Sequence, residues 1–179
     1  MDIAQNKRHL MDSSMKRILF LILLLPVSSD AQEVGRRFEL RATAGRAAFD
    51  EDHGAKVFGA ALRYSIADRL GIEPEVLYMV FDEGGFVLSR RVVVTPHLSL
   101  DFRRNSRIRP YLIGGVGWQR YTNTTRYASP NYEFSGNDWT WNAGFGVKMY
   151  LTPRAFLAPD FRFGQQPVAR LTASIGFTF

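Results

Sequence analysis

Apolar residues recur at every second position in eight segments of the chain, and polar or glycine-containing stretches separate these segments. Such period-two alternation is typical of β-strands with two unlike faces, and no stretch after residue 32 keeps the spacing of an amphipathic helix. The sequence therefore predicts an all-β fold of eight strands without a long helix. The expected strands are residues 38–45, 57–66, 72–80, 92–102, 110–119, 139–151, 155–163 and 169–179.

The connections between these segments alternate in character. Four of them are polar, contain glycine and include the one long loop: residues 50–55, 82–91, 121–138 and 164–168. The other three are short: residues 67–71, 103–109 and 152–154. This order is typical of an antiparallel up-and-down barrel with long loops at one end and tight turns at the other. Eight strands also place both ends of the barrel segment at the tight-turn end.

The two faces of the expected strands differ sharply in charge. The more apolar face carries no charged residue at all. One Arg or Lys facing the middle of a bilayer costs ~2–4 kcal/mol, so this exclusion predicts contact with lipid and a transmembrane β-barrel. The opposite face carries ten charged residues, five of each sign: Glu39, Arg41, Arg63, Glu73, Glu75, Asp101, Lys148, Asp160, Arg162 and Arg170.

Side chains fill the interior of an eight-stranded barrel, and buried charges are stable only when they are paired and hydrogen-bonded. We therefore expect the ten charged residues to form an interior salt-bridge lattice in place of an open water channel. Glu73, Glu75 and Arg162 are the leading candidates for membership of this lattice, followed by Arg41, Asp160 and Lys148. Glycines on the same face would leave room for long side chains: Gly115, Gly117, Gly144, Gly146 and Gly176.

Aromatic residues and one proline add detail to this expectation. Rings near both strand ends suggest girdles at the two membrane interfaces: Trp118, Tyr121 and Trp139 at the loop end, and Phe102, Tyr150, Phe156 and Phe179 at the other. Pro96 falls in the middle of an expected strand, where it lacks the N–H that the ladder requires. A bulge or local distortion is expected there.

The first 31 residues are typical of an export leader. Lys16 and Arg17 precede an apolar run over residues 18–27, and Ser29 and Ala31 form a small-x-small cleavage site. An apolar run of this length is too short for a transmembrane helix, which needs ~20 residues. We expect residues 1–31 to be leader and signal peptide and residues 32–179 to be the barrel domain.

Charge and cysteine content narrow the function classes. The chain has 23 Lys and Arg against 17 Asp and Glu, a net charge of +6, but the basic residues are dispersed and form no basic helix. No nucleic-acid partner is therefore expected. The absence of cysteine excludes disulfides, thiolate metal sites and a cysteine nucleophile. No cofactor or metal site is predicted.

The end of the chain alternates up to a terminal aromatic residue, with apolar side chains at Leu171, Ala173, Ile175, Phe177 and Phe179. This pattern resembles the C-terminal signal that the assembly machinery of bacterial outer-membrane barrels reads. Residues 73–78, 109–117 and 160–163 resemble strand segments of OmpA-like and related porin-superfamily small barrels. The resemblance covers residues 33–179 and implies a bacterial outer-membrane location, with membrane lipids and the outer-membrane assembly machinery as partners and both barrel ends in the periplasm.

A possible catalytic pair lies on one strand face. His97 and Ser99 are two residues apart, and a Ser, His and carboxylate set is the minimum for acyl transfer. The pair resembles the His-x-Ser pair of outer-membrane lipid A deacylases, but the Asn-Ala that follows it in that family is absent. Both side chains are expected to point into the barrel, away from lipid, so membership of the polar lattice is favoured and no catalytic residue is assigned.

Three functional hypotheses remain open. The first is a non-enzymatic outer-membrane barrel with an envelope-structural and surface-presentation role and at most narrow or gated solute passage. The segment from Tyr121 to Asp138, rich in Asn, Thr, Tyr and Ser, is its candidate surface for an unknown extracellular ligand. The alternatives are a lipid A deacylase-type hydrolase and a secreted lipocalin-type barrel that encloses a ligand with an inward apolar face. Residues 50–53 and 82–83 are acidic patches in expected loops, and their carboxylates could bind Ca²⁺ or Mg²⁺. No EF-hand spacing is present, so solvated loops are the favoured interpretation.

Overall fold

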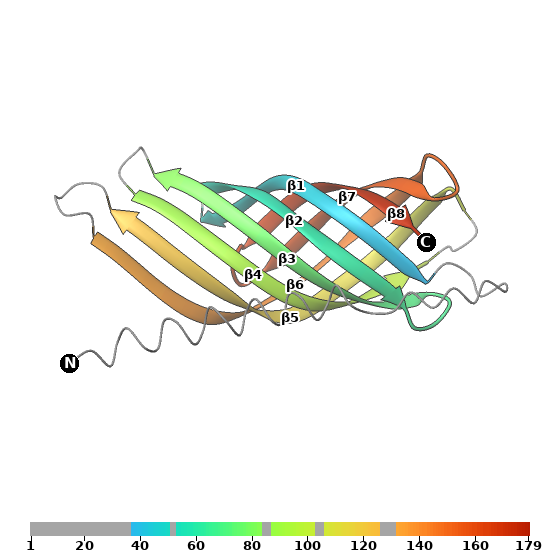
Figure 1. Ribbon diagram of the computed structural model, residues 1–179, viewed down its shortest axis with the longest axis horizontal. Helices are drawn as coiled ribbons and strands as arrows, with labels where there is room; N and C mark the ends of the chain where they lie inside the picture. Colours follow the sequence, from blue (N-terminus) through green and yellow to red (C-terminus); the bar gives the residue numbers. More distant parts are fainter. Residues whose placement is uncertain (1–36, 51–52, 84–86, 103–105, 126–131) are drawn as a thin grey trace. The chain divides into compact units, whose positions relative to one another are not determined.

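The computed structural model contains a closed barrel of eight antiparallel strands in sequence order (Figure 1). It describes residues 37–50, 53–83, 87–102, 106–125 and 132–179. The strands are β1 (Phe38–Asp50), β2 (His53–Ser65), β3 (Leu70–Glu83), β4 (Val87–Asp101), β5 (Ile108–Thr125), β6 (Tyr132–Tyr150), β7 (Ala155–Gly164) and β8 (Ala169–Thr178). The predicted fold class is thus confirmed. Among the described residues, no helix has the length and apolar character needed to cross a membrane.

The barrel closes between its first and last strands. β1 pairs with β8 along its length, and the backbone groups of Phe38 and Phe179 exchange two hydrogen bonds of 3.2 and 3.0 Å. Both ends of the barrel segment therefore lie beside the short connections β2–β3, β4–β5 and β6–β7. We call this the tight-turn end and the opposite one the hairpin end.

The sidedness of the strands is as predicted. Large apolar side chains on the outward face are exposed, with Leu98 at 57%, Phe145 at 56% and Ile175 at 68%. The alternate positions point inward and are buried, so β4 reads as a strict alternation along most of its length. A continuous apolar exterior suits hydrocarbon and not water. The lipocalin alternative is wrong, because it required this apolar face to point inward.

Several strands run further than predicted. β5 continues to Thr125 and β6 begins at Tyr132, and their ladder pairs Tyr121 with Gly136 and Thr125 with Tyr132. Most of the expected loop from Tyr121 to Asp138 is therefore a hairpin, and only residues 126–131 of it lie outside the described residues. The expected loops 50–55 and 82–91 are also largely strand. β5 and β6 have 18 and 19 residues against 10 each in β7 and β8, so their hairpin projects beyond the barrel (Figure 1).

Three outward-facing prolines interrupt the sheet without shifting its register. Each lacks an N–H, and each leaves a gap of two pairs in one neighbouring ladder: Pro74 toward β2, Pro96 toward β5 and Pro159 toward β6. The pairing resumes in the same register on both sides of each gap. The distortion expected at Pro96 is therefore an interruption of pairing and not a bulge.

The predicted aromatic girdles are correct only in part. Trp118, Trp139, Phe102 and Phe179 lie exposed on the outward face, two near each end of the apolar band. The prediction for Phe156 is wrong, because its side chain points inward and is fully buried. The half-buried Tyr150 packs against it inside the barrel. Tyr121 likewise belongs to the inward face of β5. The rings at these three positions fill the barrel instead of facing the membrane.

Candidate functional site in the barrel interior

The ten charged residues that share the inward face lie inside the barrel, and none of them is more than 4% exposed. They divide into two groups that have no ion pair in common. The tight-turn cluster consists of Glu39, Arg63, Asp101 and Lys148. The central cluster consists of Arg41, Glu73, Glu75, Asp160, Arg162 and Arg170.

The tight-turn cluster is a ring of two cations and two anions. The Arg63 Nη1 atom lies 3.1 Å from Glu39 Oε1 and 2.9 Å from Asp101 Oδ2. The Lys148 Nζ atom donates to the same two carboxylates, at 2.7 Å to Glu39 Oε2 and 3.2 Å to Asp101 Oδ2. These residues come from β1, β2, β4 and β6, so the ring links strands from around the whole barrel.

The central cluster is a chain of three cations and three anions. Arg41 pairs with Glu73 and donates a 3.2 Å hydrogen bond to the hydroxyl of Tyr111, which donates to Asp160 at 3.1 Å. Asp160 Oδ2 lies 3.1 Å from Arg162 Nη2, and Asp160 Oδ1 also accepts a 2.6 Å bond from Thr172.

Arg162 joins the two halves of that chain. Its Nη1 atom lies 3.1 Å from Glu75 Oε2, and the Nη2 atom of Arg170 lies 3.0 Å from the same oxygen. Arg162 Nη1 also lies 3.3 Å from His97 Nε2. With one cation per anion in each cluster, no net charge is buried. This balance is required because an unpaired buried ion costs several kcal/mol.

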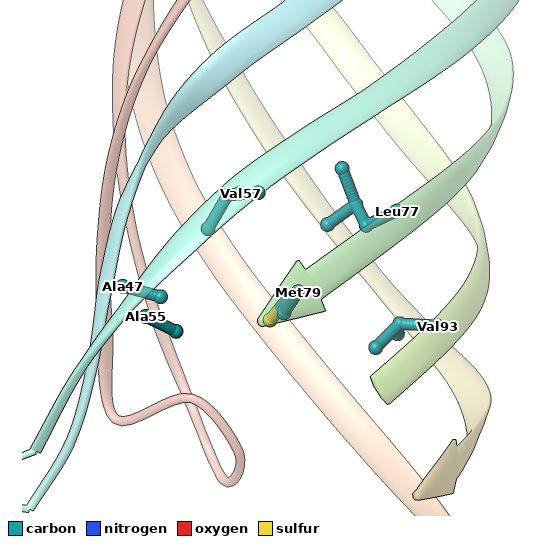
Figure 2. Packing of buried hydrophobic residues seen from close by; sticks show 6 residues of the cluster. All are labelled: Ala47, Ala55, Val57, Leu77, Met79 and Val93. Atoms are coloured by element: carbon teal, nitrogen blue, oxygen red, sulfur yellow. The ribbon is translucent and has the colours of Figure 1, made fainter. Parts of the chain in front are cut away.

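Between the central cluster and the hairpin end, the interior is apolar on the side of β1 to β4, whereas the buried polar side chains of Gln119 and Thr140 line it on β5 and β6. Six inward side chains of β1 to β4 form a buried apolar cluster, shown in Figure 2: Ala47, Ala55, Val57, Leu77, Met79 and Val93. Phe49 and Phe81 pack against it. This cluster was not predicted, because the prediction rested on the charges of the inward face alone, although the apolar residues 57, 77, 79 and 93 share that parity.

Arg91 caps the interior at the hairpin end. Its guanidinium lies 4.2 Å from the centre of the Phe49 ring and 5.6 Å from that of Phe81. Arg91 Nη1 and Gln119 Nε2 each donate a 2.8 Å hydrogen bond to Gln166 Oε1, so the β7–β8 connection is tied to the cap. Arg91 was predicted to lie in a loop, and its role as a cap follows only from the observed length of β4.

A second closure lies at the tight-turn end. The Arg109 guanidinium stacks 4.1 Å from the centre of the Tyr150 ring and donates a 3.3 Å hydrogen bond to its hydroxyl. That hydroxyl lies 3.4 Å from Glu39 Oε1, so it connects the closure to the tight-turn cluster. Tyr150 also packs against a small buried apolar group: Tyr111, Ile113, Phe156 and Ala158.

His97 and Ser99 lie inside the barrel, but they are not arranged for catalysis. His97 Nε2 lies 2.9 Å from Asn142 Oδ1, and His97 Nδ1 lies 3.3 Å from the carbonyl oxygen of Glu73. The Ser99 hydroxyl accepts a 2.8 Å bond from Arg63 Nε and donates to the carbonyl oxygen of Gly71 at 3.3 Å. Ser99 therefore has no hydrogen bond to His97, and both side chains are only 1% exposed. A serine nucleophile needs such a base and access to substrate.

Ser99→Ala is expected to lower the free energy of unfolding by about 1–2 kcal/mol, because the Nε–H group of Arg63 loses its buried acceptor. Neither the wild-type protein nor Ser99→Ala should release fatty acids from lipid A in detergent micelles. Urea unfolding and mass spectrometry of the lipid products measure the two quantities. Acyl release by the wild type that Ser99→Ala abolishes, with folding intact, would establish the hydrolase instead.

Two other sequence features were considered as sites, the acidic loop residues and the C-terminal pattern. Among the residues that the structure describes, no three His, Asp or Glu side chains are grouped so that they could hold a metal ion. The side chains of the acidic residues 50–53 and 82–83 lie outside that described set. The five residues of the C-terminal pattern point outward on β8 or just beyond it and are exposed: Leu171, Ala173, Ile175, Phe177 and Phe179.

Comparisons with known proteins agree with this architecture. The family model for the outer membrane protein beta-barrel domain matches residues 18–166. The N-terminal β-barrel domain of Pseudomonas aeruginosa OprF superposes with a TM-score of 0.60 at 16% identity, over 80% of this chain and 98% of that one. Neisserial surface protein A gives a TM-score of 0.66 at 17% identity, over 79% and 97% of the two chains. A major outer membrane protein of Thermus thermophilus gives a TM-score of 0.58 at 11% identity, over 81% and 100%.

No curated protein sequence matches the chain. The structural likenesses, all at low identity, bear on the fold, whereas the family model covers most of the sequence. An apolar exterior, a charge-paired interior and this match agree on one assignment. The chain belongs to the outer membrane protein beta-barrel family, and its place is the bacterial outer membrane.

Proposed function

We propose that this protein is a non-enzymatic envelope barrel that stabilises the outer membrane and presents the β5–β6 hairpin at the cell surface. The observation that carries the proposal is the filled interior: two charge-neutral clusters, an apolar cluster and a stacked arginine at each end occupy it. The cavity between Arg162 and Gln166 has a volume of about 10 Å³, enough for roughly one water molecule. Such an interior favours structural support over a permanent channel.

Solute passage would require rearrangement at defined places. A path along the axis has to separate Arg91 from Gln166 at the hairpin end and open both ion-pair clusters further in. Each cluster is held by several charge-assisted hydrogen bonds, which are stronger than neutral ones. Any passage is therefore narrow and gated.

The projecting hairpin is the proposed surface for an extracellular ligand. Its inward face carries Tyr121, Phe134 and Tyr132 beyond the cap, and the last two are 52% and 69% exposed. Exposed rings beside Asn and Thr side chains suit recognition of a ligand. The outward C-terminal pattern that ends at Phe179 is the proposed signal to the assembly machinery.

The test of surface presentation uses the absence of native cysteine. Ser135 on β6 and Arg154 beside β7 are both exposed, at opposite ends of the barrel. A membrane-impermeant maleimide should label Ser135→Cys on intact cells and label Arg154→Cys only after lysis, with at least a severalfold difference read by gel fluorescence. Heat-modifiable gel migration checks that both variants fold. Labelling of Arg154→Cys alone on intact cells would reverse the orientation and remove the presentation role.

A further inference from the structure

Four cations lie on the outward face near the hairpin end, where the apolar band stops. Arg46 on β1 pairs in register with Lys56 on β2. Arg90 on β4 pairs with Thr122, and Arg120 on β5 pairs with Val92, so the two arginines are diagonal neighbours. All four side chains are exposed, and none forms an ion pair with a residue whose side chain the structure describes. They form a positive rim, and the exposed carboxylate of Glu133 on the same face of β6 is paired in register with Thr124 and not with either arginine.

An apolar groove lies below one part of this rim. It crosses β4, β5 and β6 on the lipid-facing surface, extends toward the tight-turn end as far as Leu70 and Leu100, and has a volume of about 320 Å³. Its floor is the registered pair Gly114 and Ala143, and taller side chains such as Leu98, Leu112 and Phe145 form its walls. The groove exists because small residues face outward between large ones.

The distance between the rim and the groove matches the distance between the phosphate of a lipid and the inner part of its acyl chain. Arg120 lies six positions after Gly114 on β5, which is about 20 Å along the strand and roughly 15 Å along the axis of a tilted barrel. The hydrocarbon of one leaflet is also about 15 Å thick. Trp118 and Trp141 lie between them, exposed at 38% and 45%, at the level where interfacial rings are usual.

We propose that the outward face of β4, β5 and β6 binds one phosphorylated, acylated lipid of the outer leaflet. Arg90 and Arg120 hold the phosphate, because guanidinium groups match phosphate oxygens in bidentate geometry. One acyl chain lies in the groove over Gly114 and Ala143. The outer-leaflet source rests on the proposed orientation, with the hairpin end outside. Arg46 and Lys56 carry the same charge on β1 and β2, which do not line this groove.

The test is native mass spectrometry of the full chain in detergent with added diphosphoryl lipid A or phosphatidylcholine. The wild type should retain one molecule of diphosphoryl lipid A and release phosphatidylcholine. Arg90→Ser with Arg120→Ser should weaken retention about tenfold, whereas the charge-matched control, Arg46→Ser with Lys56→Ser, should change it less than twofold. Gly114→Leu fills the groove and should weaken retention about fivefold, while Ala44→Leu, on the outward face of β1, should leave it unchanged.

Three results would overturn the proposal. Equal losses in the two double variants would show a general effect of positive charge with no built site. Displacement of the lipid by millimolar inorganic phosphate would show that the site binds phosphate without any contribution from the acyl chain. Formation of dimers in place of lipid retention would show that a second copy of the chain occupies the groove. Because these measurements use purified protein, they are independent of the cysteine labelling that tests orientation, and either proposal can fail alone.

Discussion

Arg162→Ala is expected to lower the free energy of unfolding by about 3–5 kcal/mol, the cost typical of breaking a buried ion pair from one side. Arg162 joins Glu75, Asp160 and His97, and it is 2% exposed. Without it, Glu75 keeps Arg170, but Asp160 keeps only the hydroxyls of Tyr111 and Thr172. The central cluster then holds one uncompensated negative charge. Urea unfolding in lipid vesicles, followed by tryptophan fluorescence, measures the change.

Two further variants separate charge from size. Arg162→Met with Asp160→Asn removes the arginine and also the charge that it leaves behind, so this pair should recover about half of the lost stability. Arg154→Ala removes an exposed arginine and should change stability by less than about 0.5 kcal/mol. Because Arg162 also lines the small cavity near the cap, Arg162→Ala should raise single-channel conductance in planar bilayers. Unchanged stability together with unchanged conductance would contradict the interior lattice.

The sidedness of the barrel could be predicted because lipid penalises charge so strongly. Within the predicted strands, the inward parity carries ten charged residues, from Glu39 to Arg170, and the opposite parity carries none. The outward cations lie just beyond the predicted strand ends: Arg46, Lys56, Arg90 and Arg120. The pairing of these charges could not be predicted in the same way. Arg41 reaches Tyr111, 70 residues away, and Lys148 reaches Glu39, 109 residues away. These partners depend on how the strands stagger as the barrel closes, and the alternation pattern within a strand carries no information about that stagger.

The strand ends could not be predicted, because the alternation of apolar and polar residues depends on contact with lipid and not on backbone pairing between strands. Beyond the bilayer both faces of the β5–β6 hairpin are wet, so polar residues such as Asn123 and Asn137 occur on either face while the ladder continues. For the same reason the predicted fourth strand began after Arg91, whose inward position follows only from the full length of β4. The candidate lipid groove could not be predicted either, since Gly114 and Ala143 meet only through the β5–β6 register.

Gly115→Ala is expected to destabilise the barrel by about 2–3 kcal/mol, whereas Gly114→Ala, one residue earlier, should change stability by less than about 0.5 kcal/mol. A Cβ atom at Gly115 points inward and would lie 2.7 Å from His97 Cδ2 and 3.0 Å from His97 Cα, so β4 and β5 would have to separate. A Cβ atom at Gly114 points outward and meets the Ala143 Cβ at 3.7 Å, an ordinary contact.

The two variants add the same methyl group to neighbouring residues of one strand, so propensity and chain entropy change almost equally. Their difference in unfolding free energy therefore reports the packing of the two faces of β5. Urea unfolding of both proteins under identical vesicle conditions gives that difference, and heat-modifiable migration gives the folded fraction at the start. Because His97 also contacts Arg162 and Asn142, the strain at Gly115 should spread into the central cluster and raise conductance as well. Equal stability of the two variants would mean that the inward face of β5 is loosely packed, and a filled, closed interior could not then be maintained.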